Sequence, residues 1–427
     1  FTSRRRHTRS GIMSRGLGDV YKRQVVNSPA TSGKEEPRGS GPVLVRSPGL
    51  ESGRILGRYG TLPGPRLICL GGLHGNEPAG VLALRRVFSF LHDTRPPFKG
   101  QVVGIAGNIA ALRAGRRFLE RDLNRGWSPR GMQRAETFPG GPAEDGEQAE
   151  LIAVLRKELE GDRSSIKVID LHTTSAEGPP FLTLADTIRN RAFARRIGLP
   201  LVLGIEEQID GALLEVITAA GPVTLGIEAG QHDDPVSVDH HERAVWMALI
   251  AGGHVEEEDV PDAESMRTAL RNAWRGLPKV FAVRYRKPVA GEDGFSMRPG
   301  YLNFQRISAG EVVGHDRNGP VTAPEGGRIF LPLYQDQGDD GFFIVQDVHP
   351  AWLRLSAALR SLRVSSLARW LPGIHPARRR PDVLIVDRRV ARWLTVDVFH
   401  LLGYRKSRVS RGWYVFRRRS HDRKVGS

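Results

Sequence analysis

The chain has 427 residues, of which 40% are hydrophobic and 26% are charged. This length allows two or three domains, and the composition is ordinary for a globular protein. No apolar run approaches the roughly 20 residues that a membrane-spanning helix needs, so we expect no transmembrane segment. The single cysteine, Cys69, excludes an internal disulfide and lies in an apolar run, where we expect a buried core residue. A chain without disulfides suits the cytoplasm, which is the compartment we expect.

The formal net charge of +16 is concentrated at the two ends of the chain. Residues 1–24 carry +6 and residues 376–427 carry +11, so the residues between them are close to neutral. The basic character therefore says little about the substrate of the central region. Basic residues alternate with aromatic ones in residues 376–427, which leaves open a second possibility, the binding of nucleic acid or another polyanion by this tail.

The N-terminal segments are not expected to fold. Residues 1–24 have no apolar period and no signal-peptide pattern, and we expect them to be non-native or disordered. Residues 25–53 are rich in Ser, Gly and Pro, which is typical of a leader or linker.

Apolar runs then alternate with helical patterns over residues 54–255. We predict strands at residues 67–70, 101–108, 166–171, 201–203 and 223–228, and helices at residues 78–92, 144–160, 187–197 and 236–251. Between them, residues 110–127 form a polar, arginine-rich excursion. Strands separated by helices indicate an α/β domain with a mainly parallel or mixed sheet and helices on both faces.

The sequence pattern changes after residue 255. Residues 256–278 are predicted to form a linking helix, and residues 279–349 show short β-like runs between Gly and Pro, as in a smaller, mostly antiparallel β domain. Residues 350–427 are predicted to be a basic α/β extension, with helices at 352–371 and 388–402 and strands at 383–386 and 413–416. We expect the helix at 352–371 to pack on the core with a solvated basic face that includes Arg360, and an interfacial membrane helix is the alternative.

Polar residues at the ends of predicted strands indicate a metal site. In parallel α/β sheets the active site lies at the carboxyl ends of the strands, where His74, Asn108, His172 and Glu228 fall. Hydrolytic zinc sites use three ligands drawn from His and Asp/Glu and leave a fourth position open. His74 and Glu77 would be a short-range pair on one loop, and His172 a distant third ligand.

Several motifs occur together and in order. They resemble those of the succinylglutamate desuccinylase/aspartoacylase family, a deacylase branch of the zinc carboxypeptidase-like fold. The resemblance covers residues 66–348, because MRPGYLNFQ and LPLYQDQGDDGFF are similar to the β domain of bacterial members. The motifs are His74-Gly-Asn-Glu77-Pro-Ala-Gly, Asn108, Arg117, Asp122-Leu-Asn124-Arg125, Asp170-Leu-His172-Thr-Thr-Ser and Glu228-Ala-Gly.

The resemblance implies a metal centre and its catalytic groups. His74, Glu77 and His172 would bind one zinc ion, which activates a water molecule as nucleophile. Glu228 would be the general base that takes the proton from this water and passes it to the leaving amine. Arg117 would polarise the scissile carbonyl and stabilise the oxyanion. A purely structural role for Glu228 at its strand end is the alternative.

The resemblance also implies a binding site for a substrate carboxylate. Asn124 and Arg125 would hold that carboxylate. Asp122 would orient these groups or a zinc-binding histidine. We also expect Asn108 to be a substrate-binding residue. Asp122 and Asn108 could instead be turn formers that hold their loops.

Two departures from the family pattern leave the substrate open. Aspartoacylases use a tyrosine from the second domain, but here Phe342 and Phe343 stand where we would look for it, with Tyr334 nearby. No arginine shortly precedes Glu228, where that branch has another one. We therefore expect an N-acyl amino acid or a similar carboxylate-bearing amide as substrate, with a zinc carboxypeptidase acting on peptides as the alternative. The sequence does not indicate the oligomeric state.

Overall fold

The computed structural model describes residues 53–362, 373–377, 380–387, 399, 401–410, 413–419 and 422. The segments predicted to be disordered or linking before residue 53 lie outside these residues, as does nearly all of the predicted helix at 388–402. The described residues belong to one unit, Leu44–Ser427.

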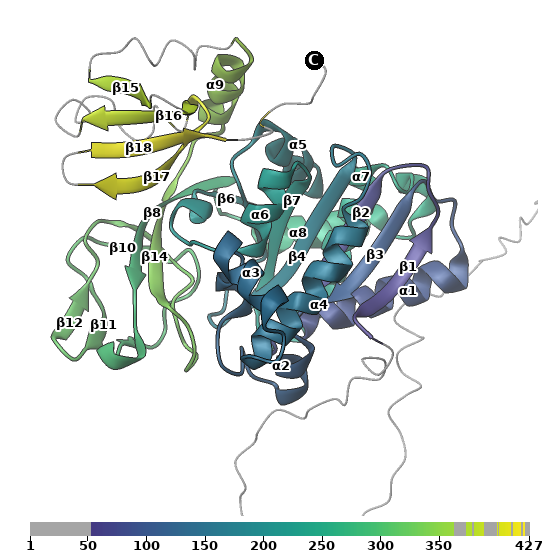
Figure 1. The fold of residues 1–427 in the computed structure, drawn as a ribbon, viewed down its shortest axis with the longest axis horizontal. Coiled ribbons are helices and arrows are strands. Elements are labelled where there is room, and N and C mark those ends of the chain that lie inside the picture. The colour runs from purple at the N-terminus through teal and green to yellow at the C-terminus, as the bar shows by residue number, and fades with distance from the viewer. Residues whose placement is uncertain are drawn as a thin grey trace, which may run out of the picture. The chain divides into compact units, whose positions relative to one another are not determined.

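A mixed sheet of eleven strands forms the centre of the structure, in the order β1-β3-β2-β4-β7-β5-β6-β8-β14-β13-β10 (Figure 1). Four neighbouring strands, β3, β2, β4 and β7, are parallel, whereas β1 and β5 run antiparallel to β3 and β7. The strands of the α/β part are β1 (Ile55–Gly60), β2 (Arg66–Gly71), β3 (Gln101–Ala106), β4 (Ile166–Thr174), β5 (Phe181–Leu184), β6 (Leu201–Leu203) and β7 (Val223–Gln231).

Helices cover both faces of this sheet, as the alternating pattern predicts. On one face, Leu67 and Cys69 of β2 pack with α1 (Ala79–Thr94), α5 (Ile188–Ile197), α7 (Val236–Gly252) and α8 (Ala263–Ala273). On the other face, Ile68 and Leu70 pack with α4 (Ala143–Glu158) and α6 (Leu213–Ala220). Successive side chains of a strand point to opposite faces, so an uninterrupted apolar run is what a doubly covered strand requires. Cys69 is fully buried, as predicted.

Several short elements were not predicted from the sequence. They are β1, β5, α2 (Ile109–Ala114), α3 (Pro129–Thr137), α6 and the 3₁₀ turns η4 (Leu123–Arg125) and η5 (Ile205–Glu207). The polar excursion at residues 110–127 therefore contains helical turns, each started by a capping side chain: Asn108 for α2 and Asp122 for η4. Short helices carry too few turns for an apolar period to be visible, and their caps stabilise them instead.

The predicted β region continues the main sheet. Here β8 (Val280–Pro288) pairs with β6 in parallel and with β14 (Asp340–Asp347) in antiparallel, followed by β13 (Gly327–Phe330) and β10 (Arg306–Ile307). A small separate sheet contains β9 (Ser296–Met297), β11 (Val312–Asp316) and β12 (Gly319–Thr322). The region is mostly antiparallel, as predicted, but it is hydrogen-bonded to the α/β part through β6 and β8.

The C-terminal region adds α9 (Pro350–Ser361) and a four-stranded antiparallel sheet. Its strands are β15 (Ile374–Ala377), β16 (Arg380–Asp387), β18 (Trp413–Arg418) and β17 (Tyr404–Ser410), in that order across the sheet. One expectation is wrong: Arg360 does not lie on a solvated basic face of α9 but is only 1% exposed. Its Nη2 donates to Oδ2 of Asp186 at 2.9 Å, because a charge at this depth requires an ionic partner.

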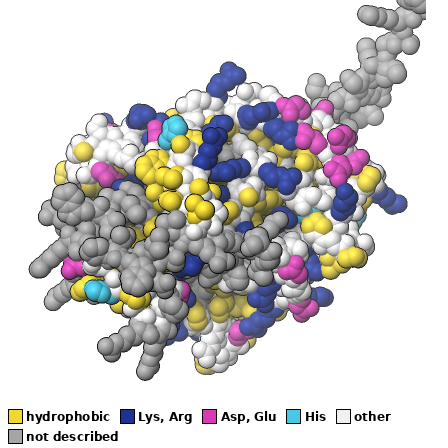
Figure 2. Space-filling model, turned by 90° about the horizontal axis from the view of Figure 1, so that it is seen from above, with side chains coloured by type: hydrophobic (Ala, Val, Ile, Leu, Met, Phe, Trp, Pro, Cys, Tyr) yellow, Lys and Arg dark blue, Asp and Glu magenta, His cyan; other side chains and the backbone are white. Residues whose placement is uncertain are grey.

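The surface of the described residues carries mixed charges. Figure 2 shows Lys and Arg side chains on one face, spread among acidic, hydrophobic and other side chains. Among the residues that the structure describes, no helix is both long and apolar enough to cross a membrane. Polyanion binding by residues 376–427, part of which lies outside the described ranges, stays a prediction.

Candidate active site

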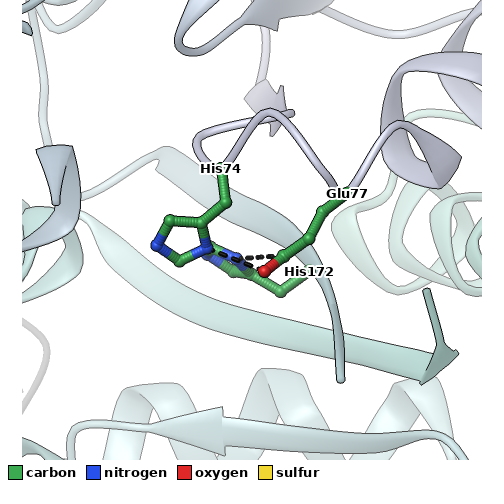
Figure 3. Close-up of side chains that lie close together, drawn as sticks. All are labelled: His74, Glu77 and His172. Carbon is green, nitrogen blue, oxygen red and sulfur yellow. Dashed lines mark hydrogen bonds and ion pairs between the residues drawn. The ribbon is translucent and has the colours of Figure 1, made fainter. Parts of the chain in front are cut away.

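Three potential metal ligands meet where two neighbouring strands end (Figure 3). His74 and Glu77 lie on the loop that connects β2 to α1, and His172 lies near the end of β4, which pairs with β2. The loop that carries His74 and Glu77 passes close to the backbone of α2: a Cβ atom on Gly75 would lie 2.0 Å from the carbonyl carbon of Ala111. Only glycine allows this approach, so Gly75 helps to place His74.

Glu77 lies between the two histidines. Its Oε1 is 2.8 Å from Nδ1 of His74, and its Oε2 is 2.9 Å from Nδ1 of His172. The backbone N–H of Thr173 donates to the same Oε2 at 3.1 Å. One ligand atom from each of the three side chains lies within 4.8 Å of the others, and all three residues are buried.

Both ring nitrogens of His172 face a carboxylate. Nε2 lies 2.8 Å from Oδ2 of Asp170, and Nδ1 faces Glu77. Although burial opposes this, the charges of Asp170 and Glu77 raise the pKa of His172 well above its usual value. Burial also opposes the lowered pKa of Glu77, which the charges of both histidines hold well below its ordinary range.

This arrangement fits a bound cation. Two acceptor atoms at hydrogen-bond distance are stable only with a proton or a metal ion between them. If Asp170 holds a proton on Nε2 of His172, the lone pair of Nδ1 is directed towards Glu77 and can bind metal, the usual arrangement of a metal-binding histidine. Two imidazole nitrogens and a carboxylate are donors that suit a divalent transition metal.

Arg117 and Asp122 complete the surroundings of His74. Nη1 of Arg117 donates to Oε1 of Glu77 at 3.3 Å, and Nη2 donates to Oδ2 of Asp122 at 3.2 Å. Nε2 of His74 lies 3.3 Å from Oδ1 of Asp122 and 3.0 Å from Nη2 of Arg117. Asp122 thus contacts a potential metal ligand and a cation of the site, and its orienting role stays a prediction.

Glu228 faces the same cluster from the next strand. It lies opposite His172 in the parallel pairing of β7 with β4. Its Oε2 is buried and has no hydrogen-bond partner among the described residues. Burial raises the pKa of Glu228 to about 8, helped by the charges of Glu77 and Asp170 and opposed by that of His172. A cation at the cluster would favour the ionised carboxylate.

A cavity of about 190 Å³ joins these groups. The predicted residues His74, Glu77, Arg117, Asn124, Arg125, His172 and Glu228 all line it. Oδ1 of Asn124 accepts the N–H of Leu213 at 2.9 Å, and Nη2 of Arg125 donates to Oδ2 of Asp340 at 2.8 Å. Both side chains therefore already have protein partners.

Asn108 does not line the cavity. Its side chain is fully buried and caps α2, since Oδ1 accepts the N–H of Ala111 at 3.0 Å, and its Nδ2 donates to Oε1 of Glu144 at 3.3 Å. Asp122 does not line the cavity either, and its Oδ1 accepts the N–H of Asn124 at 2.7 Å. The structure therefore places Asn108 in the turn-forming role that the sequence leaves open.

The second half of the chain contributes residues that sequence reasoning missed. Nδ1 of His232 lies 2.7 Å from Oγ1 of Thr173, and its Nε2 lies 3.0 Å from Oε1 of Gln335. Asn76 donates to the same Oε1 at 2.8 Å. Burial lowers the pKa of His232. His232 directly follows β7, so the strand-end signal that identified His74 also applied to it.

One aromatic residue of the β region reaches the cavity. Phe343 lines it, whereas Phe342 packs in a separate apolar cluster. The hydroxyl of Tyr334 donates to the carbonyl of Arg298 at 2.8 Å and accepts the N–H of Tyr301 at 2.9 Å. The position where aspartoacylases are expected to place a substrate-binding tyrosine thus presents an apolar ring.

The α/β part matches known proteins in sequence. Residues 63–249 match the family model described as the succinylglutamate desuccinylase/aspartoacylase catalytic domain. A probable aspartoacylase of Nostoc sp. (strain PCC 7120) is 31% identical over 112 residues, which cover 26% of this chain and 36% of that protein. The succinylglutamate desuccinylase of Photorhabdus laumondii is 36% identical over 111 residues, which cover 25% of this chain and 33% of that protein. The alignments thus span about a third of these curated relatives.

The fold is also similar to that of a solved structure. The succinylglutamate desuccinylase/aspartoacylase from Rhodobacter sphaeroides superposes with a TM-score of 0.50 at 20% identity, covering 69% of this chain and 88% of that chain. The matched region, residues 63–249, contains every site residue that the sequence predicted. Over residues 63–249, the chain is therefore similar to the catalytic domain of the succinylglutamate desuccinylase/aspartoacylase family.

Proposed function

We propose that the chain is a zinc-dependent hydrolase that cleaves the amide bond of an N-acyl amino acid or a similar carboxylate-bearing amide. One observation carries this proposal: the buried cluster of His74, Glu77 and His172 opens onto a cavity that also holds Glu228 and Arg117. Two imidazole nitrogens and one carboxylate are the donors of many hydrolytic zinc sites. Zinc bound there would polarise the scissile carbonyl and lower the pKa of a water molecule.

Glu228 is the group best placed to move protons. Its buried Oε2 has no hydrogen-bond partner among the described residues, so it is available to a water molecule in the cavity. As general base it would take a proton from that water and then pass it to the leaving amine. The leaving amine must therefore lie beside Glu228, which orients the substrate in the cavity.

Two arginines supply positive charge. Arg117 is held beside the metal cluster by Glu77 and Asp122, where a fixed cation would stabilise the oxyanion that forms from the carbonyl. Arg125 uses Nη2 for Asp340 and Nη1 for the carbonyl of Asn124, while its buried Nε has no hydrogen-bond partner among the described residues and lies 4.0 Å from Oδ2 of Asp339. It can therefore accept one substrate carboxylate in addition to Asp340.

The β region favours a small substrate over a peptide. Gln335 bonds Asn76 and His232, and Gln337 donates to the carbonyl of Phe118 at 3.2 Å. These bonds hold the segment before β14 against the loops that carry the metal ligands. A long peptide would have to displace this segment, whereas a small amide would not.

Metal analysis combined with a substrate screen tests the proposal. We expect about one zinc ion per chain and hydrolysis of at least one N-acyl amino acid, with N-acyl aspartate and N-succinylglutamate included because of the relatives' names. His74→Ala should lose zinc, whereas Glu228→Gln should keep zinc and lose activity. Zinc-free protein, or activity unchanged by Glu228→Gln, would contradict the proposal. Trimming of peptides without deacylation would favour the carboxypeptidase alternative.

A further inference from the structure

The cavity extends beyond the metal cluster into a part that we call the inner chamber, formed by Ile205, Ile209, Ala212, Leu214 and Gly226. Ile205 and Ile209 belong to η5 and the turn after it, and they pack against the apolar cluster of the β region. Leu214 lies in α6 and packs against the cluster on the other side. These side chains give the inner chamber an aliphatic wall, and Thr183, Thr218 and Thr224 line the cavity beside it.

Gly226 lies in the chamber wall beside the proposed base. It precedes Glu228 by two residues on β7, so the two positions face the same side of the sheet, about 7 Å apart. A Cβ atom on Gly226 would lie 2.3 Å from Oγ1 of Thr183, so a side chain fits only if Thr183 moves. Because the leaving amine lies beside Glu228, the inner chamber is on the amine side of the scissile bond.

The charged residues at the chamber already have counter-charges. Glu215 is 2.8 Å from Nη2 of Arg405, in β17. Oε1 of Glu206 accepts from Nη2 of Arg419, directly after β18, at 3.0 Å. Both arginines come from the C-terminal region, so this region offsets part of the negative charge of Glu206 and Glu215, although Arg419 also pairs with Glu207 at 2.7 Å.

The cavity offers few cations for a second substrate carboxylate. Among the described residues, the arginines that line it are Arg117 and Arg125, and no lysine does. Arg117 lies at the metal cluster, and Arg125 is paired with Asp340. An N-acyl amino acid has one α-carboxylate, which Arg125 can bind, but an acidic side chain in the inner chamber would have no positive partner.

We propose, on the basis of the function above, that the inner chamber binds the uncharged, apolar side chain of an N-acyl amino acid, and that Arg405 and Arg419 of the C-terminal region reduce the negative charge beside it. The substrate class is then the N-acylated aliphatic amino acids, in contrast to acidic or basic ones. Gly226 and Leu214 determine the length and width of the side chain that fits.

Matched substrates test the chamber. In the series N-acetylalanine, N-acetylnorvaline and N-acetylnorleucine, each added methylene should raise kcat/KM about fourfold until the chamber is full. N-acetylleucine should exceed N-acetylaspartate, which has a similar shape, and N-acetylnorleucine should exceed N-acetyllysine, each by at least about tenfold. Equal or higher kcat/KM for the charged member of either pair would overturn the proposal.

Two variants test whether the size and the charge of the inner chamber determine the substrate selectivity. Gly226→Ala should reduce kcat/KM for N-acetylnorleucine more than for N-acetylalanine, because the new methyl group displaces the side chain of Thr183, which lines the same cavity. Arg405→Gln leaves Glu215 without its partner and should shift the ratio of N-acetyllysine to N-acetylnorleucine about tenfold towards lysine. Arg417→Gln is the matched control: it lies in the same small sheet and pairs with Asp382 at 3.2 Å, away from the cavity lining. An unchanged ratio in Arg405→Gln would contradict the electrostatic part.

A binding measurement separates this inference from the proposed function. Calorimetric titration of the zinc-loaded protein with free norleucine, lysine and aspartate needs no turnover. If no N-acyl amino acid is hydrolysed but norleucine binds at least about tenfold more tightly than the others, the proposed function fails and the apolar chamber stands. If lysine or aspartate binds as tightly as norleucine, the chamber assignment fails even when deacylation is observed.

Discussion

Asp170 is expected to tune the metal site without binding the metal. Asp170→Asn keeps the shape of the side chain but removes the charge that lies 2.8 Å from Nε2 of His172. Asp170 is only 1% exposed, so solvent cannot replace that charge. A neutral amide is a weaker partner for the imidazole, which lowers the basicity of Nδ1 and loosens the orientation of the ring.

The expected loss of zinc affinity follows from the contact of Asp170 with only one of the proposed ligands, His172. Replacing such a partner typically weakens metal binding by about 10- to 100-fold. This corresponds to roughly 1.4 to 2.7 kcal/mol of binding free energy. The other two proposed ligands, His74 and Glu77, keep their own contacts, so zinc binding should be weakened and not abolished.

Competition titration against a chromophoric chelator measures this affinity. Asp239→Asn serves as the matched control, because Asp239 lies in α7 and pairs with Arg86 at 2.8 Å, far along the chain from the ligands. Thermal unfolding of the metal-free proteins shows whether Asp170→Asn damages the fold itself. Zinc affinity within about threefold of the parent protein would refute the assigned role of Asp170.

Three further predictions concern the fold and the access to the cavity. Arg360→Met should lower the free energy of unfolding by about 1 to 3 kcal/mol, because it removes one of the cations around the buried Asp186, which keeps Arg191, and leaves Asp422 without this cation, whereas Arg417→Gln should change it by less than about 0.5 kcal/mol. His254 is fully buried, and burial lowers its pKa to about 4 while its Nδ1 donates to the carbonyl of Lys99 at 3.0 Å. Since the unfolded pKa is about 6.5, this residue should cost the protein up to roughly 3 kcal/mol of stability as the pH falls from about 6.5 to about 4. Gln335→Ala should raise KM about three- to tenfold through the loss of two hydrogen bonds, with unchanged zinc content.

Each of these predictions has a direct check. Chemical denaturation compares the two arginine variants, and equal losses would contradict the buried ion pairs. For His254, the pH dependence of unfolding should flatten in His254→Asn, and an identical slope in both proteins would exclude this histidine as its source. For Gln335, lower zinc content together with lower kcat would indicate that the residue stabilises the loop that carries His74 and Glu77 and does not control substrate access to the cavity.

Local patterns were sufficient for the main elements of the α/β part. The apolar run at residues 67–70 forms β2, and Cys69 is buried within it, because a strand covered on both faces needs apolar residues at every position. The long helices α1, α4 and α7 show their apolar period over several turns. Short elements such as α2 and η4 depend on single capping side chains, which also occur in loops, so the sequence did not separate them from turns.

Long-range partners were not visible in the sequence. Arg360 is buried because Asp186 lies beside it in the fold, although the helical pattern alone places an arginine in solvent. His232 and Gln335 meet only because the fold brings the end of β7 and the segment before β14 together beside the loop that carries His74 and Glu77. Asn108 stands at a strand end like His74, yet its amide is used to cap α2.

The sequence by itself identified His74, Glu77 and His172 as candidate metal ligands, because they stand at predicted strand ends and within motifs that resemble those of one deacylase family. Only the tertiary structure decided which groups remain available to a substrate. Availability depends on whether a charge already has a partner, and the partners of Arg125, Glu206 and Glu215 come from segments far away along the chain. The inner chamber is likewise a property of packing, since its lining residues come from η5, α6 and β7, which only the folded chain brings together.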